Sequence, residues 1–346
     1  MEGICSCCGQ VVCGEFSKEF TSPASYGPTI KSIITTLSTD SNVTVNKLVK
    51  FISNLTDGKI NMSDGTVINM IKELAEKLKP STEEIATSLA SSDVLNVDET
   101  GFSVNGEITW MQIVVNKDYS LFARNEKRGT LNEDLDTLIN IFTGTLIHDH
   151  LSSYYNYKHT KHGECNIHGT RYLKAVTEIF KHPWAQAMTN LLLGANSKKK
   201  ELIANNIHSM TDEELSDIRN KYIEILDQGQ VEYDTAVYGK THISYYKEER
   251  RLLKRLREFI NEHLLYLQDF NVPFGNNLAE VGARYIKGKK KTSGCFRSNS
   301  GMDHYATIAS VIATLRKQHR AIFSTIRSTF LGSHPDFTTI SSQNSS

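Results

Sequence analysis

Three carboxylates in this sequence are placed where a folded chain could gather them around divalent metal ions. Asp98 lies in a predicted strand, Asp149 ends a short apolar strand, and Glu280 lies in a predicted helix. Three acids at close range would repel one another and raise their pKa values unless cations are bound between them. Oxygen ligands favour Mg²⁺ or Mn²⁺ over zinc, and two such ions could activate a water or 3′-hydroxyl and stabilise a leaving oxygen.

The segment around Glu280 supplies amides and cations as well as the acid. Pro273 and Gly275 break the preceding element, and Asn276 or Asn277 can cap a new helix. Asn277 falls on the same helix face as Glu280, where it could orient the acid or contact a phosphate. A run of cations without an acid follows, and we expect it to hold phosphates. These cations are Arg284, Lys287, Lys289, Lys290, Lys291 and Arg297. The alternative is a solvated face with one Glu–Arg pair.

Composition sets broad limits on the class of protein. The chain has 346 residues, enough for one large domain with additions or for two to three domains. Lys and Arg together number 39, as do Asp and Glu, so no overall charge points to a nucleic-acid partner. No stretch of 18 apolar residues and no leader pattern is present, so we expect neither a membrane helix nor a signal peptide. Six cysteines in a chain of this length do not indicate a secreted disulfide scaffold, and a reducing cytoplasm is expected.

The first residues resemble half of a zinc-binding ribbon. Cys5 and Cys8 have Cys-x-x-Cys spacing followed by Gly9, as in a zinc knuckle, and Cys13 comes next. Tetrahedral closure needs a second pair of ligands. Cys5 and Cys8 therefore either bind no metal stably alone or belong to a chain that has lost an upstream knuckle. We expect a shortened N-terminus and leave zinc at Cys5 and Cys8 open.

Residues 26–80 have the pattern of three short helices with caps and breakers at their ends. Pro28 suits a first helical turn, Gly58 suits a helix end, and Ser63 or Asp64 can cap the third helix. A tight turn before the third helix resembles a helix-turn-helix module, whose last helix would enter the major groove of DNA. Any three-helix bundle has this pattern, so a packing role is the alternative.

The order of the predicted elements is that of an α/β fold with an RNase H-like core. Residues 94–123 form three strands, residues 131–142 a helix, and residues 144–149 a fourth strand. In such a core the first and fourth strands are neighbours, and a later helix contributes a third acid. The fold therefore predicts that Asp98 and Asp149 lie close together.

Two further features shape this core. On a strand Asp98 and Glu99 point to opposite faces, so only one of them can enter a shared site. Residues 171–270 have a helical pattern throughout and would form an insertion between two parts of the core, with Trp184 packed inside it. Residues 301–320 predict the last amphipathic helix.

Cys165 and His168 form a Cys-x-x-His pair between a predicted strand and a helix. One such pair is weak evidence for zinc, so we assign both residues a structural or supporting role beside the site. His148 and His150 flank Asp149 and are interpreted in the same way. A zinc hydrolase built on these residues is a third alternative, but the sequence offers no convergent third ligand.

Several motifs occur in an order and spacing that are more specific than any one of them. They are Val-Asp98-Glu-Thr-Gly, Ile-His-Asp149 with Tyr154, Cys165-x-x-His168, Phe274-Gly-Asn-Asn277-x-Ala-Glu280 and Ser293-Gly-Cys-Phe-Arg-Ser298. Together with residues 23–28 and 314–318, they resemble the DDE transposases of the insertion-sequence-66 family. The resemblance covers residues 5–320.

The resemblance implies the activity and the partners of the chain. It implies that Asp98, Asp149 and Glu280 are a catalytic triad that binds two Mg²⁺ or Mn²⁺ ions for DNA cleavage and strand transfer. The implied partners are double-stranded DNA at element ends and target, at least one further copy of the chain, and helper proteins, with no membrane. A bacterial, cytoplasmic and nucleoid-associated location is expected.

The chain also departs from the family pattern. Members usually have a longer N-terminus with a coiled segment and a first zinc knuckle, and a charged residue where Val281 follows Glu280. A catalytically idle DNA-binding remnant that occupies element ends is therefore the alternative function. The expected divisions are a partial zinc knuckle (1–22), a helical DNA-binding module (23–85), a first part of the core (90–170), the helical insertion (171–270), the rest of the core (271–325) and a tail (326–346).

Overall fold

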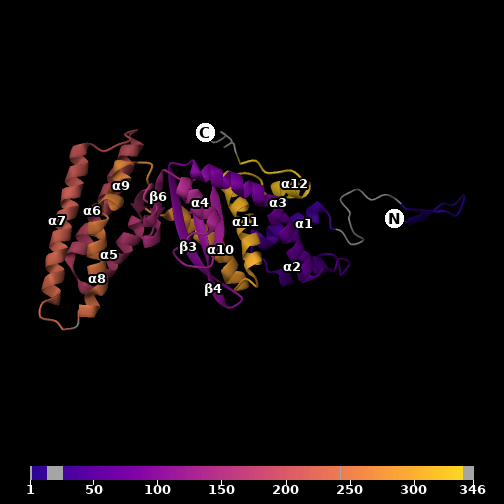
Figure 1. Cartoon of the computed structure of the whole chain (residues 1–346), viewed down its shortest axis with the longest axis horizontal. Coiled ribbons are helices and arrows are strands. Elements are labelled where there is room, and N and C mark those ends of the chain that lie inside the picture. Colours follow the sequence, from indigo (N-terminus) through magenta and orange to yellow (C-terminus); the bar gives the residue numbers. More distant parts are fainter. Residues whose placement is uncertain (1, 14–25, 242, 338–346) are drawn as a thin grey trace.

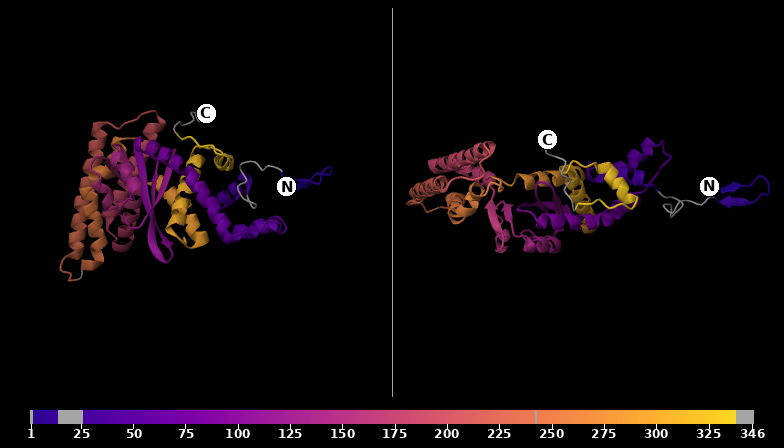
Figure 2. Two further views of the ribbon diagram at one scale, coloured as in Figure 1. Left: turned by 45° about the vertical axis from the view of Figure 1, so that its right-hand side comes forward. Right: turned by 90° about the horizontal axis from the view of Figure 1, so that it is seen from above.

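A five-stranded mixed sheet lies at the centre of the chain, with a helical bundle on one side and smaller helices on the other (Figure 1). The computed structural model describes residues 2–13, 26–241 and 243–337. Seen from above, the bundle, the sheet and the N-terminal helices follow one another along the long axis (Figure 2). No helix in the described part of the chain is long and apolar enough to cross a membrane.

The sheet has the strand order β5-β4-β3-β6-β7. Its strands are β3 (Val94–Val104), β4 (Glu107–Val115), β5 (Ser120–Asn125), β6 (Thr145–His148) and β7 (Lys161–Glu164). The first three strands in the chain pair antiparallel, whereas β6 pairs parallel with β3 and with β7. The prediction that the first and fourth strands of the core are neighbours is confirmed.

Helices cover both faces of the sheet and its β5 edge. Two helices from the C-terminal part, α10 (Asn277–Ser293) and α11 (Asn299–Lys317), bury small side chains against β3, β4 and β5. Helix α4 (Glu133–Ile141) packs with β3 and β6 in another apolar cluster. The edge strand β5 is protected from further pairing because Ser310 and Thr314 of α11 accept its backbone N–H groups.

Three N-terminal helices, as predicted, share a small apolar core of their own. They are α1 (Pro28–Thr39), α2 (Val45–Leu55) and α3 (Asp64–Ala90). We expected the third helix to end at Pro80, but α3 continues to Ala90. The cost of a proline inside a helix is offset here because Leu78, Ile85 and Leu89 of α3 are fully buried against the sheet core. Helix α3 therefore joins the N-terminal helices to the sheet core.

Residues 166–268 form the predicted helical layer, which has a separate apolar core around the fully buried Trp184. Its elements are α5 (Asn166–Phe180), α6 (Pro183–Ala204), α7 (Asp212–Val237), the 3₁₀ turn η2 (Ile243–Tyr246), α8 (Lys247–Glu258) and α9 (Ile260–Gln268). The burial of Trp184 inside this layer is as predicted. The layer lies beside β6 and β7, and its chain returns to the sheet through residues 269–276 (Figure 1).

The C-terminal segment corrects one prediction. We expected a tail from residue 326 onwards, but α12 (Ile322–Phe330) packs against α1 and α3. Phe337 is also fully buried in the sheet core. Short apolar segments of this kind bury surface without showing a long periodic pattern. Residues 338–346 of the predicted tail lie outside the described residues.

Candidate metal centre

The parallel pairing of β3 with β6 places Asp98 and Asp149 side by side. Asn96 is paired with Ile147, and two residues further along each strand the register reaches Asp98 and Asp149. Strand β6 ends at His148, immediately before Asp149. His150 then adopts the left-handed conformation with φ 70°, which turns the chain away from the sheet.

Helix α10 carries Glu280 over the face of the sheet to which Asp98 points. Asp98 pairs with Ile113 of β4, and a Cβ atom added at Gly282 would lie 3.2 Å from the side chain of Ile113. The glycine therefore permits the close approach of α10 to this face. Glu280 lies two residues before Gly282 and is partly buried, with 23% of its side chain exposed.

Asn276, at the start of α10, fixes that helix to β3. Its amide nitrogen donates to the carbonyl oxygen of Val97 at 2.7 Å, and its amide oxygen accepts from Asn96 at 2.8 Å. Asn276 is buried and is the N-cap residue, as one of the two predicted options, but its side chain bonds to β3 rather than to its own helix. Asn277 is exposed, so its contact with DNA stays a prediction.

The negative charge of Asp98 is not balanced by positive charges of the protein. Burial, followed by the charge of Asp149, raises the pKa of Asp98 to about 6, and Glu280 adds to the rise. The backbone N–H of Glu99, which donates to Asp98 at 2.7 Å, and the charge of Lys287 act in the opposite direction. One N–H donor and one lysine are too few to keep the pKa of Asp98 at that of an exposed carboxyl.

The carboxylate of Glu280 lies close to two residues of α5. Nδ1 of His168 is 3.8 Å from Oε1 of Glu280, and the guanidinium of Arg171 is 3.8 Å from Oε2. Oε1 is buried and has no hydrogen-bond partner. Arg171 was not predicted as a site residue, although it follows Cys165, the residue before α5, and His168 at intervals of three residues.

Among the described residues, the ligand atoms of Cys165, His168 and Glu280 gather within 4.8 Å of one another. Asp98 and Asp149 are outside this group, and the charge of Glu280 acts on Asp98. Cys165 and His168, assigned a supporting role beside the site, do lie beside one of the three acids. Their role in supporting catalysis stays a prediction.

Glu99 points away from Asp98, as expected from the alternation of a strand. Its two carboxylate oxygens bind Nε of Arg128 at 2.8 Å and the backbone N–H of Gly129 at 3.1 Å. Tyr154 of the 3₁₀ turn η1 (Ser152–Asn156) is buried nearby, where burial and the charges of Glu99 and Asp98 raise its pKa. Glu99 is therefore satisfied within the protein on the face opposite to the candidate site.

A buried ion-pair network lies next to Asp149, and it was not predicted from the sequence. Glu164 at the end of β7 binds His150, accepts from Tyr155 at 2.5 Å and from Arg255 of α8 at 2.7 Å. Burial opposes ionisation, but the contact with His150 and the charge of Arg255 outweigh it and hold the pKa of Glu164 below its usual range. The network fixes the helical layer to the strand ends.

His148 belongs to the same structural surroundings. It is fully buried, and its Nε2 lies 3.1 Å from Nδ1 of His162. Burial lowers the pKa of His148 to about 3, so the ring is neutral at physiological pH. Both histidines that flank Asp149 thus have partners within the protein, in agreement with the structural role assigned to them.

The predicted phosphate-binding cations are in different environments. Arg284, Lys287, Lys291 and Arg297 are exposed. Lys289 instead donates to the carbonyl oxygen of Ser38 at 2.9 Å, and burial lowers its pKa to about 8. Lys290 donates to the carbonyl oxygen of Gly101 at 3.0 Å. Lys289 connects α10 to α1, a role that a sequence of consecutive lysines does not reveal.

The N-terminal cysteines lie in a small hairpin of β1 (Glu2–Ile4) and β2 (Val11–Cys13). The turn between these strands holds Cys5 and Cys8, with Gly9 at φ 71°. The backbone N–H groups of Cys7 and Cys8 lower the pKa of the Cys5 thiol. Zinc binding at Cys5 and Cys8 stays a prediction.

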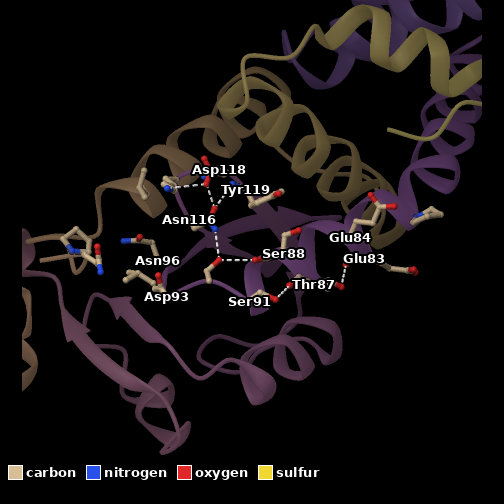
Figure 3. Close-up of a pocket in the computed structure, with 17 residues that line it drawn as sticks. Glu83, Glu84, Thr87, Ser88, Ser91, Asp93, Asn96, Asn116, Asp118 and Tyr119 are labelled. Carbon is tan, nitrogen blue, oxygen red and sulfur yellow. Dashed lines mark hydrogen bonds and ion pairs between the residues drawn. The ribbon is translucent and has the colours of Figure 1, made fainter. Parts of the chain in front are cut away.

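A separate cavity in the described part of the chain lies away from the predicted catalytic acids. It has a volume of about 970 Å³ and lies between the C-terminal half of α3, the turn between β4 and β5, and the segment before α10 (Figure 3). Glu83, Glu84, Asp93 and Asp118 line it, and none of the three predicted catalytic acids does. Because none of the three acids lines it, the cavity is not the candidate site.

Comparison with known proteins identifies one family. The model of the transposase IS66 family matches residues 24–304 of the 346-residue chain. The match includes Asp98, Asp149 and Glu280. A search of curated proteins finds no match to the chain.

Proposed function

The chain belongs to the transposase IS66 family, and we propose that it cleaves the DNA ends of its own mobile element and joins them to a target. The proposed catalytic residues are Asp98, Asp149 and Glu280. The observation that supports this assignment most directly is the parallel register of β3 and β6, which continues from the Asn96–Ile147 pair to Asp98 and Asp149. The charges of Asp149 and Glu280 both raise the pKa of Asp98, in agreement with that register and with the packing of α10 on the same face of the sheet.

We propose that the sheet and its helices form an RNase H-like core. In its support, the chain order of the first four strands of the sheet, the antiparallel meander and the parallel pairing of β3 with β6 agree with the order expected from the sequence. The helical layer of residues 166–268 separates Asp149 from Glu280 along the chain, as an insertion into such a core would.

The acids suit a pair of hard divalent cations. Carboxylate oxygens are the ligands that Mg²⁺ and Mn²⁺ prefer, and Oε1 of Glu280 is a buried oxygen without a hydrogen-bond partner. Asp98 and Asp149 would hold two ions, and Glu280 would complete the second position. When bound, these ions would supply activation of a water or 3′-hydroxyl and stabilisation of the leaving oxygen.

The protein's own cations would bind and orient the DNA. Lys287 lies close enough to Asp98 to lower its pKa, so it is the cation best placed to hold a phosphate at the acids. Arg284, Lys291 and Arg297 are exposed and available for more distant phosphates. We assign Lys289 to the α10–α1 contact instead, because its ammonium already binds the carbonyl oxygen of Ser38.

The remaining parts of the proposal concern assembly and location. The three N-terminal helices would contact double-stranded DNA, and two or more copies of the chain would act together on the element ends, with or without helper proteins. We propose a cytoplasmic, nucleoid-associated location in bacteria. Zinc at Cys5 and Cys8 would stabilise the N-terminal hairpin.

The test is cleavage of labelled DNA that carries the element ends, with wild type and Glu280→Gln compared in Mg²⁺ and in Mn²⁺. We expect nicking by the wild type only, with DNA affinity retained by the variant, because the amide removes a metal ligand without changing shape. Equal cleavage by both proteins would refute the assignment of Glu280. Binding without cleavage by both would favour the idle remnant, and restoration of a metal-stripped enzyme by Zn²⁺ alone would favour a zinc hydrolase.

A further inference from the structure

A thiol, an imidazole and a carboxylate meet where α5 and α10 begin. The sulfur of Cys165, Nδ1 of His168 and a carboxylate oxygen of Glu280 all lie within 4.8 Å of one another. Nδ1 of His168 is 3.2 Å from the sulfur and 3.8 Å from Oε1 of Glu280. Two ligand atoms that share one tetrahedral zinc ion lie about 3.4–3.6 Å apart. Small side-chain movements would therefore bring all three atoms to one ion.

The sulfur is held in place by the backbone around it. Sγ of Cys165 accepts the backbone N–H of Asn276 at 3.1 Å, and the backbone N–H groups of Ile167 and His168 also point to it. The N–H of Cys165 itself donates to the carbonyl oxygen of His148 at 2.9 Å. Cys165 is fully buried and precedes the first residue of α5. Hydrogen bonds of this kind orient a metal ligand. Burial nevertheless raises the pKa of the Cys165 thiol, so binding of a cation would have to displace its proton.

The carboxylate of Glu280 gives independent support for a bound cation. Its Oε1 atom is buried and forms no hydrogen bond within the described structure. A buried oxygen left without a partner destabilises the folded state, and proteins rarely tolerate one without a functional reason. Because Oε1 is the carboxylate oxygen that faces His168, a cation bound between them would satisfy it.

We propose that Cys165, His168 and Glu280 form a binding site for one thiophilic divalent cation of the zinc type, with water as the fourth ligand. No third ligand for the Cys-x-x-His pair could be predicted from the sequence, and the fold supplies one from a residue more than a hundred positions away. The site uses the same carboxylate as the proposed Mg²⁺ or Mn²⁺ centre. A zinc ion bound here therefore withdraws Glu280 from that centre and lowers its capacity for Mn²⁺, a consequence that rests on the proposed function.

Cobalt spectroscopy tests the site without any DNA or activity. The protein is the full chain with serine in place of Cys5, Cys7, Cys8 and Cys13, so that the N-terminal cysteines cannot bind the probe. One equivalent of Co²⁺ should give a near-ultraviolet sulfur-to-cobalt charge-transfer band and visible bands of tetrahedral cobalt, and Zn²⁺ should displace it.

Matched variants decide whether these residues carry the signal. Cys165→Ser should remove the charge-transfer band, and His168→Ala should weaken Co²⁺ binding by at least about tenfold. Cys295→Ser, which changes an exposed thiol, should leave both unchanged. Absence of the band in the parent protein, or its persistence in folded Cys165→Ser, would overturn the proposal. If Cys165→Ser does not fold, the His168→Ala titration decides alone, and unchanged binding there would refute the site.

Competition separates this proposal from the proposed function. Electron paramagnetic resonance of free Mn²⁺ counts the ions bound to the same protein before and after one equivalent of Zn²⁺. We expect zinc to reduce Mn²⁺ binding in the parent protein and not in Cys165→Ser. Unchanged Mn²⁺ binding at full zinc occupancy would refute the sharing of Glu280. A cobalt band without any Mn²⁺ binding would instead count against the proposed function and leave the zinc-type site standing.

Discussion

Two carboxylates on the strands that flank β6 have opposite surroundings, although Glu164 is fully buried and Asp98 is partly buried. Glu164 on β7 is bound by His150, Tyr155 and Arg255, and the contact with His150 and the charge of Arg255 hold its pKa below the usual range despite burial. Asp98 on β3 has other acids for neighbours, and its pKa rises to about 6. One acid is therefore satisfied by its neighbours and the other is not.

The difference separates a structural acid from a functional one. A buried charge with several donors fixes neighbouring elements in place, as Glu164 does for β7 and α8. Acids that are shielded from water, have few donors and lie beside other acids cost stability, and perturbed acids of this kind cluster at functional sites. The comparison therefore predicts that substitutions on the two sides have effects of opposite sign on stability and different effects on activity.

The largest effect should follow the loss of an acid on the unsatisfied side. Asp149→Asn should lower the rate of DNA cleavage by about 10³-fold or more, because a metal ligand is removed, while the affinity for DNA changes little. Single-turnover cleavage and a binding titration measure the two quantities. Asp134→Asn, an exposed acid of α4, is the control and should cleave at the wild-type rate. A slow control would point to misfolding, and an active Asp149→Asn would contradict the account.

The next effect concerns the satisfied side. Glu164→Gln should lower the free energy of unfolding by about 3 kcal/mol, because Arg255 and His150 would lose their buried partner. Urea unfolding at pH 7 measures this change. Glu258→Gln, which breaks an exposed i,i+4 pair with Lys254, should change stability by less than about 0.5 kcal/mol. If both substitutions changed the free energy of unfolding equally, Glu164 would not be a stabilising structural acid, and the comparison would fail.

These two regions also show how far the sequence could be interpreted. The acids of the candidate site could be found because each follows or lies in a strongly patterned element, and the strand order brings two of them together. The partners of Glu164 could not be found, because Tyr155 lies 9 residues and Arg255 lies 91 residues away along the chain. Only tertiary packing decides which of many charged residues meet inside a protein.

The sequence also cannot distinguish between neighbouring residues of the same type. The choice between Asn276 and Asn277, and between Lys289 and its neighbours, depends on the rotation of α10 against the sheet and α1. A position in a helix predicts which residues share a face but not which neighbour covers that face. The continuation of α3 past Pro80 has a similar cause, because burial on both sides of the proline outweighs the local preference.

A smaller effect of opposite sign is expected for Asp98→Asn in metal-free protein. The folded-state pKa of Asp98 is about 6, above its ordinary value of 3.8, so ionisation of this acid destabilises the folded state above pH 6. The substitution should raise the free energy of unfolding by about 2 kcal/mol at pH 8. The gain should fall towards zero near pH 4, where the acid is protonated in the folded state. Urea unfolding at both pH values measures it, and a variant that is less stable at pH 8 would contradict the account.

The smallest effect is the pH dependence of metal binding. Protons compete with cations for Asp98, so Mn²⁺ affinity should fall as the pH drops through about 6, by at most about tenfold per pH unit. Calorimetric titration between pH 5 and pH 8 would record the change. Glu164→Gln, if folded, should keep the same profile, because Glu164 does not bind the ion. A flat profile would show that Asp98 is not a ligand.

Iron-directed cleavage of the polypeptide tests the central claim most directly. Fe²⁺ with ascorbate and peroxide generates radicals at a bound metal and cuts the nearby backbone, and fragment masses locate the cuts. The account predicts cuts near Asp98, Asp149 and Glu280 that Mg²⁺ suppresses and that persist in Cys165→Ser, which lacks the thiol. Cuts confined to other parts of the chain, or cuts that Mg²⁺ leaves unchanged, would contradict the assignment of these three acids as one metal centre.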